Sequence, residues 1–437
     1  MNLTGRTVVV YGAGVSGISA AQLVRDLGGR AIIYDDNPTK SHSTSDTSVF
    51  RDCDMVVVSP GVSPANPHLL DAKLGGKQVL GELEFASVLC AAEQIAVTGT
   101  NGKTTTTLLI DHILKSAQIP SHAVGNIGAA FSAIADKLDG METVVIEASS
   151  FQLEGMRYFA PDIAVMLNIT PDHLDRHGSM ERYIGAKANV FLRQAASDVA
   201  VYNADDANVM SLEPVIRAKK VPFSLTHPVD GAYLSSGFVC FRGMPVVGAE
   251  ELDFAGRELE DVLAAVAVAA EKGVSLYTVA SALSSFRRPE YRREECGRVA
   301  GVRMFNDSKA TNVFSTLSAA EGMQGDTVLI LGGADRGEDF EELFSSLPAG
   351  VKGAVVTGEN AEKIAAGARE CGFAPVRESP DIFDACADAV DLAHELGCDN
   401  VLFSPSSKSY DRYASFSERG RAFDAAVAKL AREKGEK

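Results

Sequence analysis

Residues 99 to 104, Gly-Thr-Asn-Gly-Lys-Thr, are the segment whose residue types and spacing point most clearly to chemistry. They follow the apolar run Gln94-Ile95-Ala96, which predicts a strand that enters a tight turn and then a helix opened by Lys103. Backbone N–H groups of such a turn hold phosphate oxygens, the lysine reaches the β- and γ-phosphates, and the next hydroxyl binds Mg²⁺. We therefore predict an ATP site made by Gly99, Thr100, Asn101, Gly102, Lys103, Thr104 and Thr105.

This phosphate loop, residues 99–104, is shorter than the usual one. The usual loop has a glycine at the position that Val97 holds here. The departure separates the chain from ordinary P-loop NTPases and favours a smaller group of ATP-using families.

A second glycine-rich turn lies near the amino terminus. The run Gly12-Ala-Gly14-Val-Ser-Gly17 follows an expected strand, and Asp35-Asp36 comes about 20 residues later, as in dinucleotide-binding folds. By itself this motif predicts an NAD- or FAD-dependent enzyme. The same geometry binds any nucleotide diphosphate at a helix N-terminus, so the identity of the nucleotide stays open at this point.

Polar side chains follow further expected strands in the middle of the chain. Glu147 ends the strand Thr143–Glu147, where an acid beside a phosphate loop can bind Mg²⁺, and His173 follows the strand Ile163–Ile169. Lys187 lies in an expected helix, and the pattern alone does not distinguish it from a solvated lysine.

The last third of the chain has three polar loops, each directly after an expected strand. They are 306–312 (Asn-Asp-Ser-Lys-Ala-Thr-Asn), 332–337 (Gly-Gly-Ala-Asp-Arg-Gly) and 404–411 (Ser-Pro-Ser-Ser-Lys-Ser-Tyr-Asp). Any one of them could be ordinary turn chemistry. Together they predict a ligand site at one edge of one sheet, because open α/β sheets bind ligands at the carboxyl ends of their strands.

Composition excludes several classes of protein. The formal charge of −17 argues against a nucleic-acid or anionic-membrane partner. The seven cysteines include no CxxC pair and predict reduced thiols. The start of the chain has no secretory leader, and the longest apolar run, Val262 to Ala270, is far too short to span a bilayer. We expect a soluble, cytoplasmic protein.

The element pattern predicts an α/β fold. Short β-branched strands alternate with helices, as in parallel sheets covered on both faces, and a hairpin is expected at Phe238–Phe241. An alanine-rich helix is expected at 258–271, and the charged segment 287–295 is expected to be a domain hinge. We predict three domains, at residues 1–90, 91–288 and 289–437.

The motifs together resemble the Mur ligase family over the whole chain and in order. The phosphate loop resembles that of all Mur ligases and of folylpolyglutamate synthase. The run Asn306 to Asn312 resembles the signature of the D-glutamate-adding branch, and Gly125-Asn126-Ile-Gly128 and the Asp172-His173 turn also match. The resemblance implies a Rossmann-like UDP-binding domain, a P-loop ATPase domain and a C-terminal Rossmann-like domain.

The resemblance also implies an activity, which is the ATP-dependent addition of D-glutamate to UDP-N-acetylmuramoyl-L-alanine in the cytoplasmic synthesis of peptidoglycan precursors. Two Mg²⁺ ions and a monomer are expected. One Mg²⁺ would be held by Thr104 and Glu147, and the other by His173 and by Lys187 as a carbamate. Lys103, Glu147, His173 and Lys187 would be the catalytic residues.

The remaining site residues follow from the same resemblance. ATP would also contact Arg292, Asn306 and Asp307. The UDP-precursor would contact Val15, Ser16, Asp36, Gly61 and Asn126, without NAD. D-Glutamate would contact Thr311, Arg336, Ser409 and Phe416, with Arg336 a cationic partner for one carboxylate.

The chain departs from the family pattern at three motifs. The Gly-x-His-Asn-x-x-Asn run of the family is Gly256-Arg-Glu258-Leu-Glu-Asp261 here, so two amides expected at ATP are replaced or lost. The family's Pro-His-Arg is Pro289-Glu-Tyr291-Arg292, and the last loop has Ser406, Ser407 and Lys408. Three alternatives therefore stay open: a related ligase for another amino acid or for folate, an NAD-dependent oxidoreductase, and a non-catalytic homologue that binds a UDP-sugar.

Overall fold

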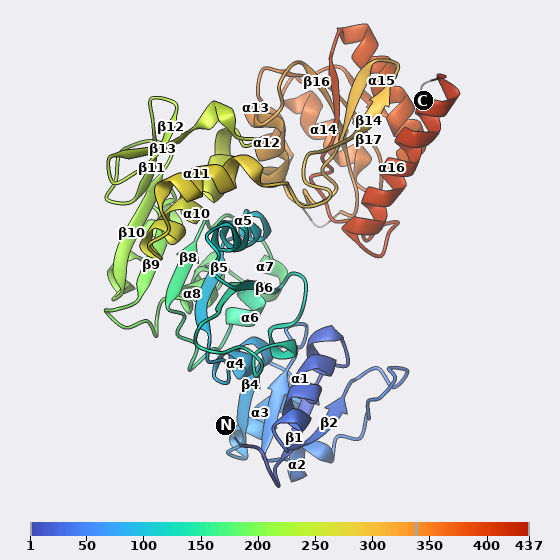
Figure 1. Ribbon diagram of the computed structural model, residues 1–437. Coiled ribbons are helices and arrows are strands. Elements are labelled where there is room, and N and C mark those ends of the chain that lie inside the picture. The colour runs from blue at the N-terminus through green and yellow to red at the C-terminus, as the bar shows by residue number, and fades with distance from the viewer. Residues whose placement is uncertain (1, 336, 338–339, 436–437) are drawn as a thin grey trace. The chain divides into compact units, whose positions relative to one another are not determined.

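The computed structural model describes residues 2–335, 337 and 340–435 (Figure 1). The described residues form three sheets, each with helices on both faces. The chain divides into two compact units. The N-terminal unit comprises Met1–Glu251 and Glu260–Phe286, and the C-terminal unit comprises Leu252–Leu259 and Arg287–Lys437. The observed sheets confirm the expected α/β class with mainly parallel strands, whereas the division into three domains stays a prediction.

The first sheet is wholly parallel, with strand order β2-β1-β3-β4. Alternate residues of β1 point to opposite faces, so Val8 and Val10 pack under α1 and α4 while Val9 and Tyr11 pack under α2 and α3. The elements are β1 (Thr7–Tyr11), α1 (Val15–Asp26), β2 (Arg30–Tyr34), α2 (Val49–Asp52), β3 (Met55–Val58), α3 (Pro67–Leu74), β4 (Gln78–Gly81) and α4 (Glu82–Ser87).

The second sheet also belongs to the N-terminal unit and has the order β13-β12-β11-β10-β9-β8-β5-β7-β6. Its strands are β5 (Glu93–Thr98), β6 (Ser121–Gly125), β7 (Thr143–Glu147), β8 (Ile163–Met166), β9 (Val199–Asn203), β10 (Lys219–Ser224), β11 (Ala232–Ser235), β12 (Phe238–Phe241) and β13 (Met244–Gly248). Only β11, β12 and β13 pair in antiparallel fashion, which confirms the expected hairpin.

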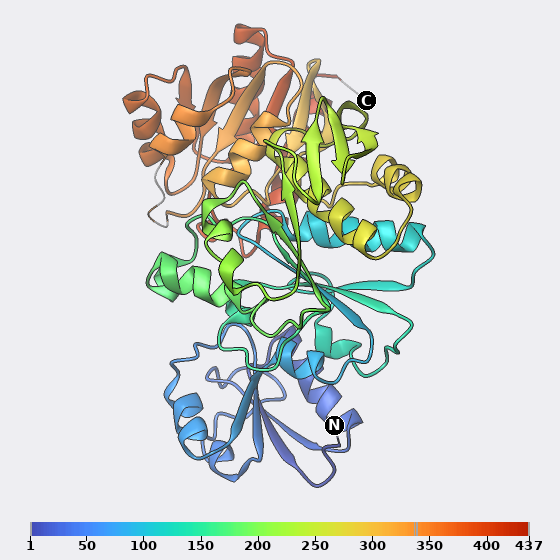
Figure 2. The same ribbon diagram turned by 90° about the vertical axis from the view of Figure 1, so that its left-hand side faces the viewer.

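The helices of the second sheet are α5 (Lys103–Ser116), α6 (Ser150–Leu153), α7 (Leu174–His177), α8 (Met180–Ala188), α9 (Ala207–Met210), α10 (Leu259–Glu271) and α11 (Leu276–Ser285). Helices α5 and α11 lie side by side, as Figures 1 and 2 show. Helix α5 begins at Lys103 as expected, and α10 begins one residue later than the expected alanine-rich helix.

The third sheet, in the C-terminal unit, has the order β14-β15-β19-β16-β17-β18. Its strands are β14 (Glu294–Val299), β15 (Val302–Asn306), β16 (Thr327–Leu331), β17 (Val351–Val356), β18 (Val376–Glu378) and β19 (Asn400–Phe403). Helices α15 (Ile382–Leu396) and α16 (Phe416–Glu433) cover one face, and α12 (Val313–Glu321), α13 (Glu341–Ser346) and α14 (Ala361–Glu370) cover the other. The hinge expected at 287–295 is wrong at its end, because its last two residues already belong to β14, which pairs antiparallel with β15.

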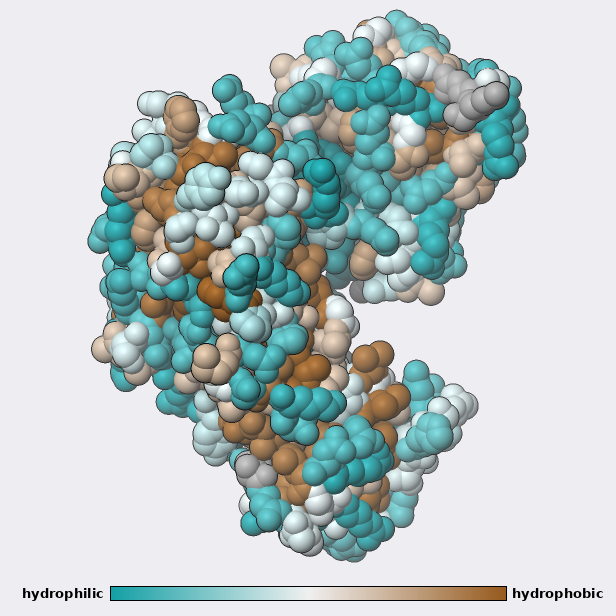
Figure 3. All heavy atoms as spheres, viewed as in Figure 1, coloured by the Kyte–Doolittle hydropathy of each residue, from teal (hydrophilic) through white to brown (hydrophobic). Residues whose placement is uncertain are grey.

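Hydrophilic residues cover most of the face of the C-terminal unit that Figure 3 shows. Among the described helices, none has the length and apolar character that crossing a lipid bilayer requires. All seven cysteines carry free thiols, as expected.

Candidate active site

One edge of the second sheet gathers most of the residues predicted for ATP. Strands β8, β5, β7 and β6 are parallel neighbours, so their carboxyl ends meet at this edge. The phosphate loop follows β5, Glu147 ends β7, Asn126 follows β6, and His173 lies beyond β8. Pairing of the strands thus brings together residues that are far apart in the sequence.

The phosphate loop adopts a conformation that its glycines make possible. Gly102 has a φ of 83°, and a Cβ at this position would lie 2.0 Å from Oδ1 of Asp261, so any other residue would strain the backbone and displace the Asp261 side chain. The ammonium of Lys103 folds back over the loop and donates to the carbonyl oxygens of Gly99 (2.9 Å) and Thr100 (2.7 Å). A cation and the N-terminus of α5 therefore lie together, as a phosphate site requires.

Asn168 holds the loop from the neighbouring strand. Its carbonyl accepts from the N–H of Thr100 and its side-chain oxygen accepts from the N–H of Asn101, both at 2.8 Å. Sequence reasoning did not select Asn168 as a site residue. Its only signal was its place near the end of the expected strand Ile163–Ile169, which ends at Met166 in the structure.

Thr104, Glu147 and Asn126 form one hydrogen-bonded cluster. The Thr104 hydroxyl donates to one oxygen of the Glu147 carboxylate and the Asn126 amide donates to the other, each at 2.8 Å. A hydroxyl and a carboxylate beside a phosphate loop are the oxygen ligands that Mg²⁺ prefers. The cluster fits the magnesium site predicted at Thr104 and Glu147.

Lys187 is buried, with 1% of its surface exposed, and its Nζ donates to the carbonyl of Gly99 at 2.6 Å. Burial holds the pKa of Lys187 well below its usual range and the nearby ammonium of Lys103 adds to this, against the attraction of Asp172 and Glu147. The solvated lysine that the pattern alone allowed is therefore excluded. The Lys187 side chain therefore reaches the phosphate loop, and its lowered pKa favours the neutral amine.

His173 lies in the turn before α7, with a left-handed φ of 54°. Its Nε2 lies 3.6 Å from Oδ2 of Asp172, and its ring centroid lies 4.7 Å from that of Phe151. Among the described residues, no three His, Cys, Asp or Glu side chains gather as a metal site. A second metal at His173 would therefore need a further ligand, such as a carbamate on Lys187.

The residues predicted for the UDP-precursor lie at the carboxyl edge of the first sheet. Val15 and Ser16 open α1, where Val15 is exposed and Ser16 is half-buried. Asp36 lies just beyond β2, and Gly61 lies in the loop after β3. The Asp36 carboxylate accepts hydrogen bonds from the hydroxyls of Tyr11 (2.6 Å) and Tyr34 (3.1 Å). The strand order reverses between β1 and β3, where α/β sheets bind nucleotides.

In the C-terminal unit, the residues predicted for ATP begin at the end of β15. Asn306 is fully buried, and its amide donates to the Gly420 carbonyl (3.0 Å) and to Oδ1 of Asp424 (2.7 Å). Asp307 accepts from the Ser404 hydroxyl at 2.7 Å, and burial raises its pKa to about 7. The structure thus gives Asn306 contacts inside the unit.

Arg292, the third ATP candidate of this unit, is half-buried and attracts Asp307, whose pKa it lowers against the effect of burial. Its Nε is buried and has no hydrogen-bond partner among the described residues. A buried guanidinium nitrogen without a partner is costly, so a ligand that accepts from it would be stabilised.

The D-glutamate candidates lie around the loops that follow β15, β16 and β19. Thr311 is half-buried before α12, Ser409 is buried beyond β19, and Phe416 opens α16, where its carbonyl accepts from the Ser308 hydroxyl at 2.8 Å. Arg336 lies outside the described residues.

One buried arginine joins these loops, and sequence reasoning missed it. Arg419, 3% exposed on α16, donates to the carbonyls of Ser308 and Ser407 at 2.8 Å each and more weakly to Gly332 at 3.5 Å. Burial lowers its pKa to about 10, still far above neutrality, so the guanidinium is charged. A single arginine inside a helix gave no sequence signal of this role.

Two acids of the altered run Gly256–Asp261 make contacts of their own. Asp261 is 8% exposed and accepts from the Thr106 hydroxyl at 3.0 Å, against the phosphate loop. Glu258 belongs to the C-terminal unit and binds Arg288 and Arg293. Both positions have therefore taken on contacts within their own units.

The sequence matches two family models. The model described as Mur ligase middle domain matches residues 97–237, and the model described as Mur ligase, glutamate ligase domain, matches residues 287–407. These stretches contain the phosphate loop, the loops 306–312 and 332–337, and the first residues of the loop 404–411.

The similarity to two relatives and to one solved structure covers nearly the whole chain. The UDP-N-acetylmuramoylalanine–D-glutamate ligase of Geobacillus sp. is 37% identical, over 97% of this chain and 98% of the relative. The enzyme of the same name from Alkaliphilus oremlandii is 36% identical, over 99% and 100%. The crystal structure of the UDP-N-acetylmuramate-alanine ligase of Thermotoga maritima has the same fold, with a TM-score of 0.61, 19% identity and coverage of 97% and 99%.

Proposed function

The chain belongs to the Mur ligase family, and we propose that it is the member that joins D-glutamate to UDP-N-acetylmuramoyl-L-alanine. Similarity over full length to two ligases of that name supports the substrate pair. The observation that carries the proposed chemistry is the cluster of Thr104, Glu147 and Asn126 beside the phosphate loop.

The reaction activates a carboxylate. ATP transfers its γ-phosphoryl group to the carboxylate of the alanyl end, which gives an acyl phosphate and ADP. The amine of D-glutamate attacks the acyl carbon, and the tetrahedral intermediate loses phosphate to leave the amide. Several negative charges meet in this reaction, so the chain must neutralise them and align the reactants.

The phosphate end of the site is built by the second sheet. Lys103 would turn from its loop carbonyls to the β- and γ-phosphates, and the backbone N–H groups of the loop would hold the remaining oxygens. Thr104 and Glu147 would hold Mg²⁺, which supplies positive charge at the phosphoryl group. Asn126, held by Glu147, would donate to the reacting end of the precursor.

We propose that Lys187 is carbamylated. The amine reacts with CO₂ only in its neutral form, losing a proton, and the lowered pKa favours that form. The carbamate would place an anion beside the ammonium of Lys103. Together with His173 it would hold the second Mg²⁺.

A labelling experiment tests the carbamate. In buffer with ¹³C-bicarbonate, the wild-type protein should give a carbamate ¹³C signal and Lys187→Met should not. Lys115→Ala, which changes an exposed lysine of α5, should keep the signal. An equal signal in Lys187→Met would assign the modification to another lysine and end the proposal.

The D-glutamate end lies in the C-terminal unit, where Thr311, Arg336, Ser409 and Phe416 would contact the amino acid. ATP would contact Arg292, Asn306 and Asp307 from the same unit. The unpartnered Nε of Arg292 supports such a contact.

The proposal also covers the domains of the protein, its oligomeric state and its place in the cell. The three sheets support three domains at residues 1–90, 91–288 and 289–437, of which the first would bind the UDP moiety. The protein would be a monomer. It would act in the cytoplasm, where peptidoglycan precursors are made.

Phosphate release measured with a panel of amino acids tests the function. Release should require ATP, UDP-N-acetylmuramoyl-L-alanine and D-glutamate together. L-Lysine, meso-diaminopimelate and a folate substrate should not replace them. Release with L-lysine or meso-diaminopimelate but not with D-glutamate would assign the chain to another branch, and no release with any combination would favour a non-catalytic homologue.

A further inference from the structure

We propose that Arg176 is a positioning residue for the UDP-precursor, because its guanidinium fastens the loop 59–62 of the first sheet to the turn that carries His173. The inference rests on the proposed function, in which Gly61 contacts the precursor. Arg176 itself does not have to touch substrate.

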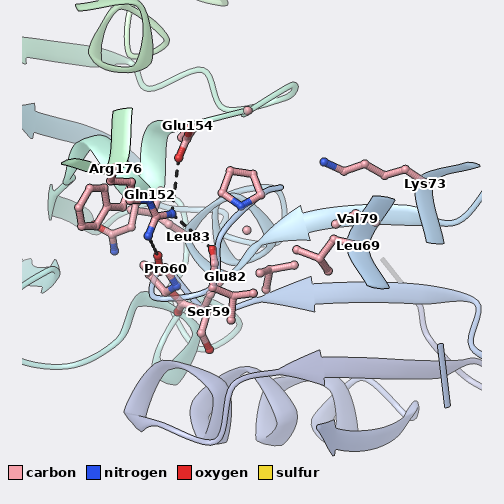
Figure 4. Close-up of a pocket in the computed structure, with 16 residues that line it drawn as sticks. Ser59, Pro60, Leu69, Lys73, Val79, Glu82, Leu83, Gln152, Glu154 and Arg176 are labelled. Atoms are coloured by element: carbon pink, nitrogen blue, oxygen red, sulfur yellow. Dashed lines mark hydrogen bonds and ion pairs between the residues drawn. The ribbon is translucent and has the colours of Figure 1, made fainter. Parts of the chain in front are cut away.

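The guanidinium binds the loop on both sides of Gly61. Its Nη1 donates to the carbonyl of Pro60 at 3.1 Å, and its Nη2 donates to the carbonyl of Val62 at 3.3 Å. Figure 4 shows the Arg176 side chain reaching Pro60 on one side and Glu154 on the other. A planar fork can satisfy two carbonyls at once, which the single ammonium of a lysine does less well.

The loop also has backbone hydrogen bonds of its own, from the N–H of Ser59 to the carbonyl of Tyr11 at 2.9 Å and from the N–H of Val62 to the carbonyl of Ser59 at 3.0 Å. Behind it lies a cavity of about 80 Å³, lined by apolar side chains such as Val58, Leu69 and Leu83 (Figure 4). Outside Gly61 and its two chain neighbours, no heavy atom lies within 4 Å of where a Cβ on Gly61 would be. No side chain therefore packs over Gly61 itself, and the two hydrogen bonds from Arg176 to its neighbours add to the backbone contacts that fix its position.

Arg176 is itself held against the second sheet. Its Cζ lies 4.1 Å from the centroid of the Phe151 ring, and the same ring lies 4.7 Å from that of His173. The backbone N–H of Arg176 also donates to the carbonyl of His173 at 3.1 Å. One residue thus links the loop expected at the precursor to the turn expected at the metal.

The ion pair with Glu154 does not explain this arrangement. The two side chains are 3.5 Å apart and remain 19% and 29% exposed, the geometry of a surface pair that contributes little. A variant that tests the proposal should therefore remove the hydrogen bonds from Arg176 to the carbonyls of Pro60 and Val62.

Steady-state kinetics with each of the three substrates test the proposal. Arg176→Met keeps a long apolar side chain on Phe151 but removes both carbonyl contacts. We expect it to raise the KM for UDP-N-acetylmuramoyl-L-alanine about tenfold, with the KM values for ATP and D-glutamate within about twofold of wild type. Arg176→Lys should have a precursor KM between those of the wild type and of Arg176→Met. It replaces Arg176→Met in the test if that variant does not fold.

Glu154→Gln and the exposed Arg182→Met are the matched controls, and both should keep the wild-type KM for the precursor. A precursor KM unchanged in both Arg176→Met and Arg176→Lys would overturn the proposed positioning role of Arg176. So would an equal rise in all three KM values with a lower melting temperature, which indicates a purely structural role. Absence of precursor-dependent turnover in the wild type would instead contradict the proposed function. Failure of the proposed function is thereby distinguished from failure of the Arg176 proposal, which requires an active wild type.

Discussion

Lys103 donates to two carbonyls of its own loop, so its ammonium is already placed where phosphate oxygens would arrive. Exchanging loop carbonyls for phosphate needs only a small movement of the side chain. The residue is partly exposed and its burial is modest, so its value lies in charge at the reacting phosphoryl group rather than in stability.

Lys103→Ala should lower kcat for phosphate release by about 10²–10³-fold, the usual effect of removing one preorganised donor. The melting temperature should change little. Lys115→Ala is the matched control, since this lysine is on the same helix and its side chain is 56% exposed. Retained turnover in Lys103→Ala would remove the phosphate role of the loop.

Asp307 predicts a pH dependence of stability. Burial raises its folded pKa to about 7, whereas an unfolded aspartate titrates near about 3.9. Between these values the folded chain keeps a proton that the unfolded chain has lost. The contribution of Asp307 to the free energy of unfolding is therefore greatest below the window and is lost as pH rises through it.

Urea unfolding of the wild type and of Asp307→Asn between about pH 5 and about pH 8 measures this contribution. The free energy of unfolding of the variant, relative to wild type, should rise with pH by up to about 1.4 kcal/mol per unit inside the window. Asp388→Asn, an acid of α15 in the same unit, controls for net charge. Parallel profiles for wild type and Asp307→Asn would show that Asp307 is already ionised at low pH.

At the scale of elements, α16 contributes the residue that organises the C-terminal loops. Arg419 lies in the first turns of this helix and donates to the loops after β15, β16 and β19. Its guanidinium can make these contacts at once because its donors are fixed in one plane. The three loops are therefore held by one side chain.

Arg419→Lys should destabilise the C-terminal unit by about 3 kcal/mol, since about two charge-assisted hydrogen bonds are lost. Calorimetry should show a melting temperature lower by roughly 10 °C for a unit of this size. The KM for D-glutamate should rise with it. Arg432→Lys, on the exposed end of the same helix, should change neither value, and an unchanged KM in Arg419→Lys would separate these loops from D-glutamate.

Elements with strong patterns were predictable from the sequence. The strands Thr143–Glu147 and Phe238–Phe241 have their expected bounds, and α5 begins at the expected Lys103, because β-branched runs and a glycine turn are local signals. Strand β14 was missed, since Glu294–Val299 is a largely polar edge strand defined by its pairing with β15.

In the candidate site, too, residues with a local sequence signal were predictable, and residues defined by long-range contacts were not. Strand ends and glycine turns indicated the phosphate loop and Glu147, because parallel strands place their carboxyl ends at one edge. The partners of Arg419 and Asp261 are more than 80 residues away in the sequence or on another element, so only the folded chain reveals them. Residues that act through long-range hydrogen bonds leave no periodic pattern.

At the scale of the whole molecule, the chain passes between its units more than once. Leu252–Leu259 belongs to the C-terminal unit although the residues on both sides of it belong to the N-terminal unit. Glu258 holds this segment there. Its carboxylate takes two bonds from Arg288, at 2.8 and 2.9 Å, and one from Arg293 at 3.0 Å.

This ionic latch, Glu258 with Arg288 and Arg293, uses an acid of the altered run Gly256–Asp261. The side chains are only 12%, 9% and 9% exposed. A buried carboxylate between two buried guanidinium groups cannot be removed without leaving uncompensated charge. The changed motif therefore defines where the two connecting segments are fastened to each other.

Glu258→Ala should cost about 3–5 kcal/mol of stability in the C-terminal unit, as expected when one partner of a buried ion pair is removed. The segment 252–259 should open, so tryptic cleavage after Arg257 should accelerate at low protease concentration, where cleavage follows the open population. Asp253→Ala is the control, because its side chain is 74% exposed and a surface pair contributes at most about 1 kcal/mol. Equal cleavage in both variants would mean that the latch behaves as a surface pair and that other contacts hold the segment in its unit.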